Sequence, residues 1–349
     1  MNILHVILTI MKKSLFLLLG IITMTGCTQS EILESRSDEN VEIKLKSSAM
    51  SVEASTRAPF EGTIAGGNTL TARVLASKAQ GNYATTYADD AMTFIDNGTT
   101  AAGFTTTKIY YPADNSVVYL CGLYPSTGWA ATQTTTTSFT FDGSHDVMAA
   151  VEVSSTKDAV KGGTNIPTLA FKHLLTQLVI KAVAADAAAI TAWGNLTDIT
   201  LSKAGGANNP NAKVEVTLAT GAAATASAFS SPVSNDSFKF WQKGTDPDAA
   251  FAGQAKALTT TGEEVAYSMV SPITATGTAD YTLLVKTANS VSAGITVPVN
   301  LKATGGGAYS GDTQGKKFVV TLTFKATEIT AVATVQPWTE DGKGEEEIQ

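Results

Sequence analysis

The cluster in this chain that most resembles a catalytic set lies between Phe141 and Asp146, where Asp142, Ser144 and His145 follow one another closely. A carboxylate, a hydroxyl and an imidazole form a nucleophilic serine site when all three converge in space. Neighbours on a tight loop point in different directions, and Asp-Gly-Ser is a common turn sequence. The pattern therefore predicts a turn rather than an active site.

Few other residues could do chemistry. His5 belongs to or precedes a leader sequence and His173 to an apolar strand, where it is expected to be packed or hydrogen-bonded, so a zinc site is not expected. The glycine-rich stretch 311–317 departs from a phosphate loop, because Ser310 replaces the first glycine and Lys317 the hydroxyl residue. It is predicted to be a hairpin turn. We expect no catalytic residue, metal or cofactor, and predict that the protein is not an enzyme.

The cysteine at position 27 indicates export. Lys12 and Lys13 precede an apolar run at 15–22, and small residues lead to Cys27. This order is typical of a secretion signal that ends at a lipidated cysteine. The alternative is a membrane helix, for which the run is short, since a span needs about 20 residues. We expect residues 1–26 to be a signal peptide, with its true start at Met11, and Cys27 to carry lipid.

Composition narrows the class of protein further. Lipidation of Cys27 would leave Cys121 as the one free thiol, which excludes an intrachain disulfide and predicts a small buried residue at 121. Charged residues make up 16% of the 349 residues and the net charge is -7, so the surface is rich in hydroxyl groups and offers no basic patch. Nucleic acid is therefore not an expected partner.

Period-two alternation of apolar and polar residues recurs along the chain and predicts an all-β protein. The clearest runs are 41–46, 213–218, 281–286 and 318–324. Glycine- and asparagine-rich turns separate the strands, as in β-sandwiches. One short helix is expected at 186–193, with Asp186 near its start. The stretch from Gly205 to Asn211 is the best candidate boundary, which predicts two tandem β-sandwich domains at 58–207 and 208–349.

The segment 27–57 is predicted to be a lipidated propeptide. Residues 28–40 are polar and suit a flexible tether, and a strand-like stretch follows at 41–52. Arg57 comes next, before Ala58 and Pro59, and arginine is rare in this chain. An arginine exposed at such a junction suits a protease site. The alternative is an ordinary solvated arginine.

Four features together resemble the fimbrillin family, the lipoprotein-derived pilins of type V fimbriae. They are the signal ending at Cys27, the strand followed by Arg57, the apolar strand at 169–181 that opens with Phe-x-His, and the ending at 329–338 that closes on a tryptophan. The resemblance covers most of the chain. It implies that the two sandwiches are transthyretin-like and that the precursor is a lipoprotein of the outer membrane.

The resemblance also implies a mechanism of assembly. An arginine-specific protease would cut after Arg57, leaving Ala58 as the new N-terminus and removing the pro-strand. A strand from another subunit would then fill the empty groove. The pro-strand residues expected to plug the groove are Val41, Ile43 and Leu45, with Met50 and Val52 as further candidates. The candidate donor-strand residues are Ile329, Ala331, Ala333 and Val335, although this stretch could equally be the ordinary last strand of the second sandwich.

The expected function is therefore a structural subunit of a cell-surface fimbria that supports adhesion. Arg57 argues against an anchor subunit and no further adhesin domain is expected, which favours the shaft or stalk over the tip. Expected partners are other fimbrial subunits, the outer membrane through the lipid, and a host or bacterial surface ligand. The alternative is a surface lipoprotein that binds glycans, which would need exposed aromatic residues. A secreted hydrolase is a weaker alternative, because no acid–base pair has a defining spacing.

Overall fold

The computed structural model describes residues 40–49, 69–95, 100–131, 134–203, 211–223, 229–232, 238–242, 249–290 and 293–336. Contacts divide the chain into two units, Met1–Val41 and Glu42–Gln349, and nearly all the described residues belong to the second. The described chain is almost entirely β-structure, as the alternation predicted. None of its helices has the length and apolar character that crossing a membrane requires.

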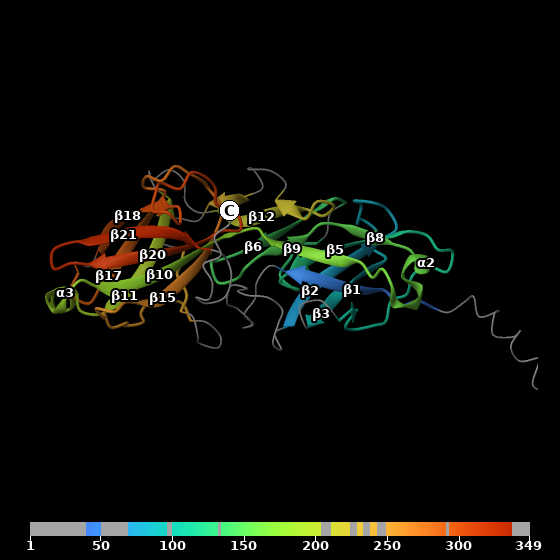
Figure 1. The fold of residues 1–349 in the computed structure, drawn as a ribbon, viewed down its shortest axis with the longest axis horizontal. Coiled ribbons are helices and arrows are strands. Elements are labelled where there is room, and N and C mark those ends of the chain that lie inside the picture. The colour runs from blue at the N-terminus through green and yellow to red at the C-terminus, as the bar shows by residue number, and fades with distance from the viewer. Residues whose placement is uncertain are drawn as a thin grey trace, which may run out of the picture. The chain divides into compact units, whose positions relative to one another are not determined.

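An eight-stranded sheet is built from the first half of the chain (Figure 1). Its order is β3 (Ala88–Ile95), β2 (Thr69–Ser77), β5 (Val118–Tyr124), β7 (Met148–Ala150), β9 (Thr168–His173), β1 (Lys44–Ala49) and β4 (Ala102–Gly103), with β8 (Val153–Ser155) also paired to β5. A bridge between Met92 of β3 and Phe104, just after β4, joins the two ends of this order. The sheet is therefore rolled into a ring around its own apolar interior.

A second, seven-stranded sheet also has the two ends of its strand order joined by bridges. Its order is β11 (Leu196–Lys203), β17 (Tyr281–Thr287), β18 (Ile295–Lys302), β21 (Ile329–Gln336), β20 (Lys317–Phe324), β10 (Thr176–Ala184) and β15 (Glu263–Val270). The segment 238–242 bridges its two ends, because Lys239 pairs with Thr200 of β11 and Trp241 with Tyr267 of β15. Two of its strand pairs, β10–β20 and β18–β21, are parallel, and the others are antiparallel.

Two smaller sheets complete the described strands. In the first, β12 (Asn211–Thr217) pairs with β6 (Thr136–Thr140), β13 (Ala222–Ala223) and β14 (Phe229–Pro232). In the second, β16 (Thr274–Ala275) pairs with β19 (Gly311–Asp312). The chain thus crosses from the eight-stranded sheet to the seven-stranded sheet between β9 and β10, and later returns to pair β12 with β6. Two domains with a boundary at 207/208 stay a prediction.

Helix is confined to short segments among the described residues. They are α2 (Lys157–Val160), the 3₁₀ turn η2 (Lys161–Gly163) and α3 (Ala187–Trp193). Asp186 caps α3, because its carboxylate accepts a hydrogen bond from the backbone N–H of Ala189 at 2.8 Å. Gly194 ends the helix with a φ of 66°, a left-handed value that favours glycine. The predicted helix at 186–193 is confirmed.

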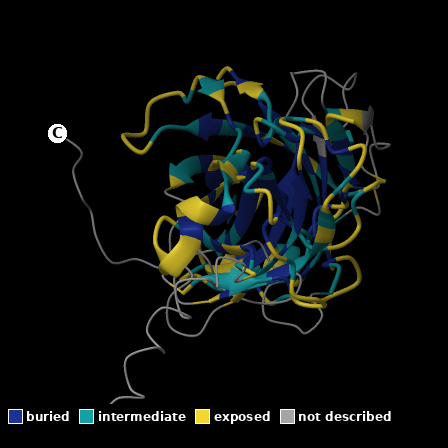
Figure 2. Cartoon of the chain, turned by 90° about the vertical axis from the view of Figure 1, so that its right-hand side faces the viewer, coloured by how far each residue is buried: buried dark blue, intermediate teal, exposed yellow. Residues whose placement is uncertain are grey.

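The strands bury one face, as the alternation predicted. Along β17, buried side chains alternate strictly with half-buried ones, and β9 alternates between buried and exposed positions. By contrast, β10 is buried on both faces over its first five residues. Leu178 and Ile180 belong to the main apolar core. On the opposite face of β10, Val179 packs with Tyr267, Val319 and the partly buried Trp241. Figure 2 shows the buried residues concentrated in the strands and the exposed residues in the loops.

Candidate functional site

The predicted pro-strand is an ordered part of the eight-stranded sheet. We call Ile43, Leu45 and Ser47 the inner row, because these alternate residues in and just before β1 face the apolar interior. Ile43 and Leu45 are completely buried and Ser47 is 2% exposed. Val41, the third predicted plug residue, is only half-buried. Met50 and Val52 lie outside the described residues.

Two neighbours hold β1 through the backbone. Lys46–Ala49 pair in parallel with Thr168–Phe171 of β9, while Lys44 and Leu45 pair antiparallel with β4. The N–H groups of Ile43 and Lys46 also donate to the carbonyls of Ile109 and Pro167, at 2.8 and 2.9 Å. In Figure 1 the blue β1 is drawn close to the green β9, although more than a hundred residues separate them in sequence. β1 is therefore the member of the ring that connects β9 to β4.

The interior behind the inner row is closely packed. Phe171 of β9 meets Phe94 of β3 edge to face, with ring centroids 6.2 Å apart. Gly122 of β5 leaves space for that ring, because a Cβ at this position would lie 2.6 Å from the Phe171 Cζ atom. Sequence reasoning missed Gly122, since nothing near it in sequence shows that an aromatic ring from β9 covers it.

The face of β1 and its preceding residues opposite the inner row is charged and exposed to solvent. Glu42 lies 3.6 Å from Lys44 and 4.0 Å from Lys108, and both lysines are exposed. Such surface ion pairs contribute little, on the order of 0–1 kcal/mol. The inner row and the backbone pairing therefore hold β1, and the charges keep its outer face soluble.

The candidate donor strand has a different place in the fold. β21 lies between β18 and β20, pairing with β20 over its whole length and with β18 over Ala331–Thr334. Ile329, Ala331 and Ala333 are buried, and Val335 is half-buried. In this structure β21 is thus a central strand with longer pairing than β1. Its role as a donor stays a prediction.

Cys27, Arg57 and Ala58 lie outside the described residues. Arg73, the arginine within them, lies in the middle of β2, which is paired on both sides by β3 and β5. Its guanidinium donates two hydrogen bonds to Asp89, at 2.8 and 2.7 Å. An arginine held in this way is a poor protease target, since cleavage requires the local chain to open.

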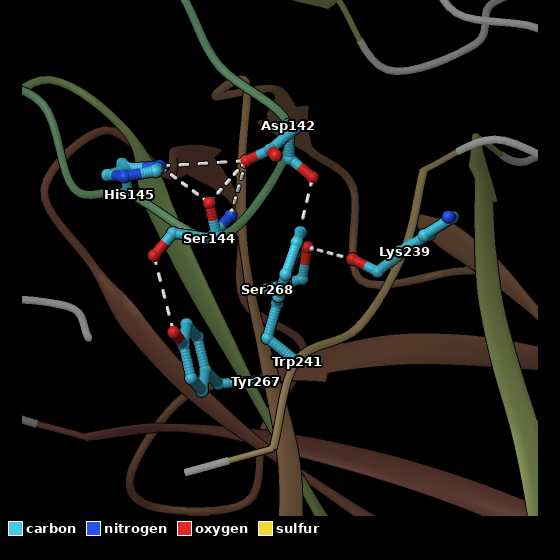
Figure 3. A network of polar contacts seen from close by, with 7 residues as sticks. All are labelled: Asp142, Ser144, His145, Lys239, Trp241, Tyr267 and Ser268. Atoms are coloured by element: carbon cyan, nitrogen blue, oxygen red, sulfur yellow. Dashed lines mark hydrogen bonds and ion pairs between the residues drawn. The ribbon is translucent and has the colours of Figure 1, made fainter. Parts of the chain in front are cut away.

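The Asp-Gly-Ser-His cluster forms a compact turn (Figure 3). Ser144 donates from its hydroxyl to Asp142 at 2.5 Å and lies 2.5 Å from the Nδ1 atom of His145. Because the hydroxyl hydrogen goes to Asp142, His145 has to be the donor in the second contact. A general base must instead accept the serine proton, with the histidine standing between serine and carboxylate. Ser144 is also only 1% exposed. Its backbone N–H donates to the Asp142 carboxylate at 3.0 Å, the local bond typical of an Asp-Gly-Ser turn, so the predicted turn is confirmed.

This turn connects the N-terminal strands to the seven-stranded sheet. Trp241 donates its indole N–H to the Asp142 carbonyl and Tyr267 its hydroxyl to the Ser144 carbonyl, both at 3.3 Å (Figure 3). Gly143 has a φ of 96°, and a Cβ there would meet the Ser268 hydroxyl at 2.5 Å. The turn therefore requires glycine, and its hydrogen bonds are structural.

Electrostatics in the same region also suit a structural role. Partial desolvation by the surrounding turn would raise the pKa of the largely exposed Asp142 carboxylate, but hydrogen bonds from His145 and Ser144 outweigh it and lower that pKa to about 2. Nearby, Nδ1 of His173 lies 2.6 Å from Asp146, and both side chains are buried. His173 is thus the hydrogen-bonded strand residue that the sequence predicted.

The remaining thiol is also structural. Cys121 is buried in β5, and desolvation raises its pKa to about 12, so it is far from being a reactive thiolate. The described part of the chain contains no group of three or more metal-ligating side chains. Residues 313–316 form a turn between β19 and β20. The hairpin predicted for the glycine-rich stretch is wrong, because β19 pairs with β16 while β20 pairs with β10 and β21.

Most of the described aromatic residues that could stack on sugars are held by the fold, although Tyr110 is 37% exposed. The indole N–H groups of three tryptophans donate to backbone carbonyls, which fixes these side chains in the fold: Trp129 to Pro125, Trp193 to Lys325 and Trp241 to Asp142. Tyr111 is buried. A surface cleft of about 340 Å³ contains the half-exposed Tyr87, but the Lys78 ammonium lies 5.3 Å above that ring. Trp338 lies outside the described residues.

Comparisons with known proteins identify the family. The fimbrillin-like family model matches residues 56–338. The structure is similar to that of a presumed cell adhesion protein from Bacteroides uniformis, with a TM-score of 0.53, 15% identity, and 85% of this chain and 99% of that chain covered. A presumed cell adhesion protein from Bacteroides ovatus gives a TM-score of 0.54 and 15% identity, over 87% of this chain and 100% of that one.

At this identity the two structures establish a shared fold, and the family model carries the assignment. Comparison with curated protein sequences gives no significant match. Because the family model covers well over half of the chain, the protein belongs to the fimbrillin-like family, whose members are structural fimbrial proteins rather than enzymes.

Proposed function

We propose that this protein is a structural subunit of the shaft or stalk of a cell-surface fimbria, and that it is made as a precursor whose β1 is later removed. The observation that carries this proposal is the position of β1. Its inner row fills part of the apolar interior, and its backbone connects β9 to β4. Removal of β1 would open the ring between β9 and β4. The exposed groove would then accept a strand from another subunit.

The free energies involved favour a β1 strand that is held firmly in the uncut precursor and can be released after cleavage. Complete burial of Ile43 and Leu45 contributes roughly 1.5–3 kcal/mol for each side chain. The backbone pairing adds to this while β1 remains joined to the chain. Once the connection is cut, the segment also gains the freedom of a separate molecule, so release becomes favourable at low concentration. A covalent cut can therefore convert a stable precursor into a subunit ready to assemble.

The position of Arg57 supports cleavage there. It lies between the end of β1 at Ala49 and the start of β2 at Thr69, so a cut would separate β1 without breaking a described strand. The family match begins at Thr56, next to Arg57, and thus leaves β1 outside the shared region. The paired Arg73 would survive the same protease. Ala58 would become the mature N-terminus.

The C-terminal region is the proposed donor. Ile329, Ala331, Ala333 and Val335 form the alternating row that the groove requires. Since β21 is paired on both sides here, donation would require it to leave β18 and β20 during assembly. Lipid on Cys27 would hold the precursor on the outer membrane until the protease acts. The mature subunit would pass into the fimbrium, with other subunits as its partners and a surface ligand as the target of adhesion.

The test uses purified precursor that lacks Cys27, treated with an arginine-specific protease. Intact mass and N-terminal sequencing locate the cut, and gels of unboiled samples show oligomers. We expect one cut after Arg57, release of the β1 segment and a ladder of oligomers. The Arg57→Lys protein keeps the charge but not the cleavage site, and should remain whole and monomeric. A cut at Arg57 that leaves a stable monomer still holding β1 would overturn the proposal.

A further inference from the structure

The inner row of β1 contains one residue that does not match its surroundings. Ile43 and Leu45 are aliphatic, but the third position is Ser47. Ser47 is 2% exposed, and its hydroxyl has no hydrogen-bond partner among the residues that the structure describes. A buried hydroxyl without a partner has lost its hydrogen bonds to water and gained none in return.

The neighbours of Ser47 explain why the hydroxyl has no partner. In the parallel register Ser47 lies opposite Leu169 of β9, and Ala49 lies opposite Phe171. Leu169 and Phe171 are buried on the inner face of the sheet, so the hydroxyl points into aliphatic and aromatic surroundings. Unpartnered burial of such a group weakens the closed state by about tenfold to a hundredfold in equilibrium constant.

We infer that Ser47 weakens the binding of β1 in its groove relative to an all-apolar strand, and that this position selects for a replacing strand with a small apolar side chain. This inference rests on the proposed function. The partner is an amphipathic strand of another subunit whose third inward residue is the size of alanine. Such a strand keeps the aliphatic contacts and removes the unpartnered hydroxyl. The difference would give strand exchange its direction without any further energy source.

The position of Ser47 within the strand is suited to this role. It lies beyond Leu45, toward the end of β1 that leads to Arg57. After a cut at Arg57 this end is the free end of the segment, and Ser47 is the last of the three inner-row residues before it. Release can therefore begin at Ser47 and proceed toward Leu45 and Ile43, with a replacing strand entering behind it.

The test compares Ser47→Ala with Ser48→Ala. Ser48 is the adjacent exposed residue and provides a matched control in the same strand. Hydrogen exchange of the β9 amides in uncut precursor reports how often β1 opens, and mass spectrometry after protease treatment reports how quickly the cut segment leaves. We expect Ser47→Ala to reduce both opening and release by about tenfold or more. Ser48→Ala should match the wild type.

The two measurements separate this inference from the proposed function. If the protease cuts elsewhere, the proposed function fails, while hydrogen exchange of uncut precursor still reports on Ser47. If Ser47→Ala opens as often as the wild type, or more often, the hydroxyl does not weaken the strand and the inference is overturned. If both substitutions slow opening equally, the effect belongs to strand propensity rather than to the buried hydroxyl, which also overturns it.

Discussion

Replacing Leu45 by alanine tests whether the inner row holds the precursor together. Leu45 is completely buried, and its backbone pairs with β4. Leucine-to-alanine changes in cores lower the free energy of unfolding by about 2–5 kcal/mol, because they lose apolar burial and leave a cavity. A central value of about 3 kcal/mol corresponds to a fall in Tm of about 4–5 °C for a chain of this size.

Leu45→Ala should also speed the release of the β1 segment from the cut protein. The loss of about 3 kcal/mol of binding should speed release of the β1 segment by up to about a hundredfold. Oligomers should then appear sooner. The assembled material should be indistinguishable from the wild type, since Leu45 has left with the segment. Leu45→Ala and Ser47→Ala thus shift release in opposite directions.

Calorimetry of uncut precursor and a time course of release by mass spectrometry provide the two measurements. Ser48→Ala, which changes an exposed side chain of the same strand, is the control and should alter neither quantity. Equal behaviour of Leu45→Ala and Ser48→Ala would refute the assignment of Leu45 to the core. A lower Tm with unchanged release would instead show that β1 is not what leaves after cleavage.

Two further predictions address the scaffold around the groove and the turn next to it. Gly122→Ala should lower the free energy of unfolding by about 1–3 kcal/mol in both cut and uncut protein, because the new methyl group would lie 2.6 Å from Phe171. Calorimetry measures the change. Gly305→Ala is the control, since a methyl group at that position meets open space. Asp142→Asn should lower stability by less than about 1 kcal/mol, since the carboxylate is largely exposed and solvent screens its interactions. The pKa of Asp142 is lowered to about 2, so its contribution is present above pH 4 and disappears as the pH falls toward 2. The difference in Tm between wild type and Asp142→Asn should therefore shrink over that interval, and a difference that grows on acidification would contradict the assignment.

The sequence by itself determined the local features of this protein. Alternation placed the strands and identified Ile43 and Leu45 as inward-facing, because side chains of a strand point to opposite faces whatever the strand pairs with. Asp186 marked the start of α3, since a carboxylate at that position bonds to the helix's own backbone. The Asp-Gly-Ser turn was predictable for the same reason: the groups that stabilise it are close neighbours in the chain.

Only the tertiary structure decided which strands meet. Apart from proline, every residue carries the same backbone hydrogen-bonding groups, so β1 carries no local signal that it runs parallel to β9. Nor does the sequence around Gly122 show that this glycine leaves room for Phe171. The partner of a strand is chosen by how the whole interior packs. For the same reason Ser47 reads in the sequence as an ordinary polar residue, and its lack of a hydrogen-bond partner follows from the apolar side chains that β9 brings against it from more than a hundred residues away.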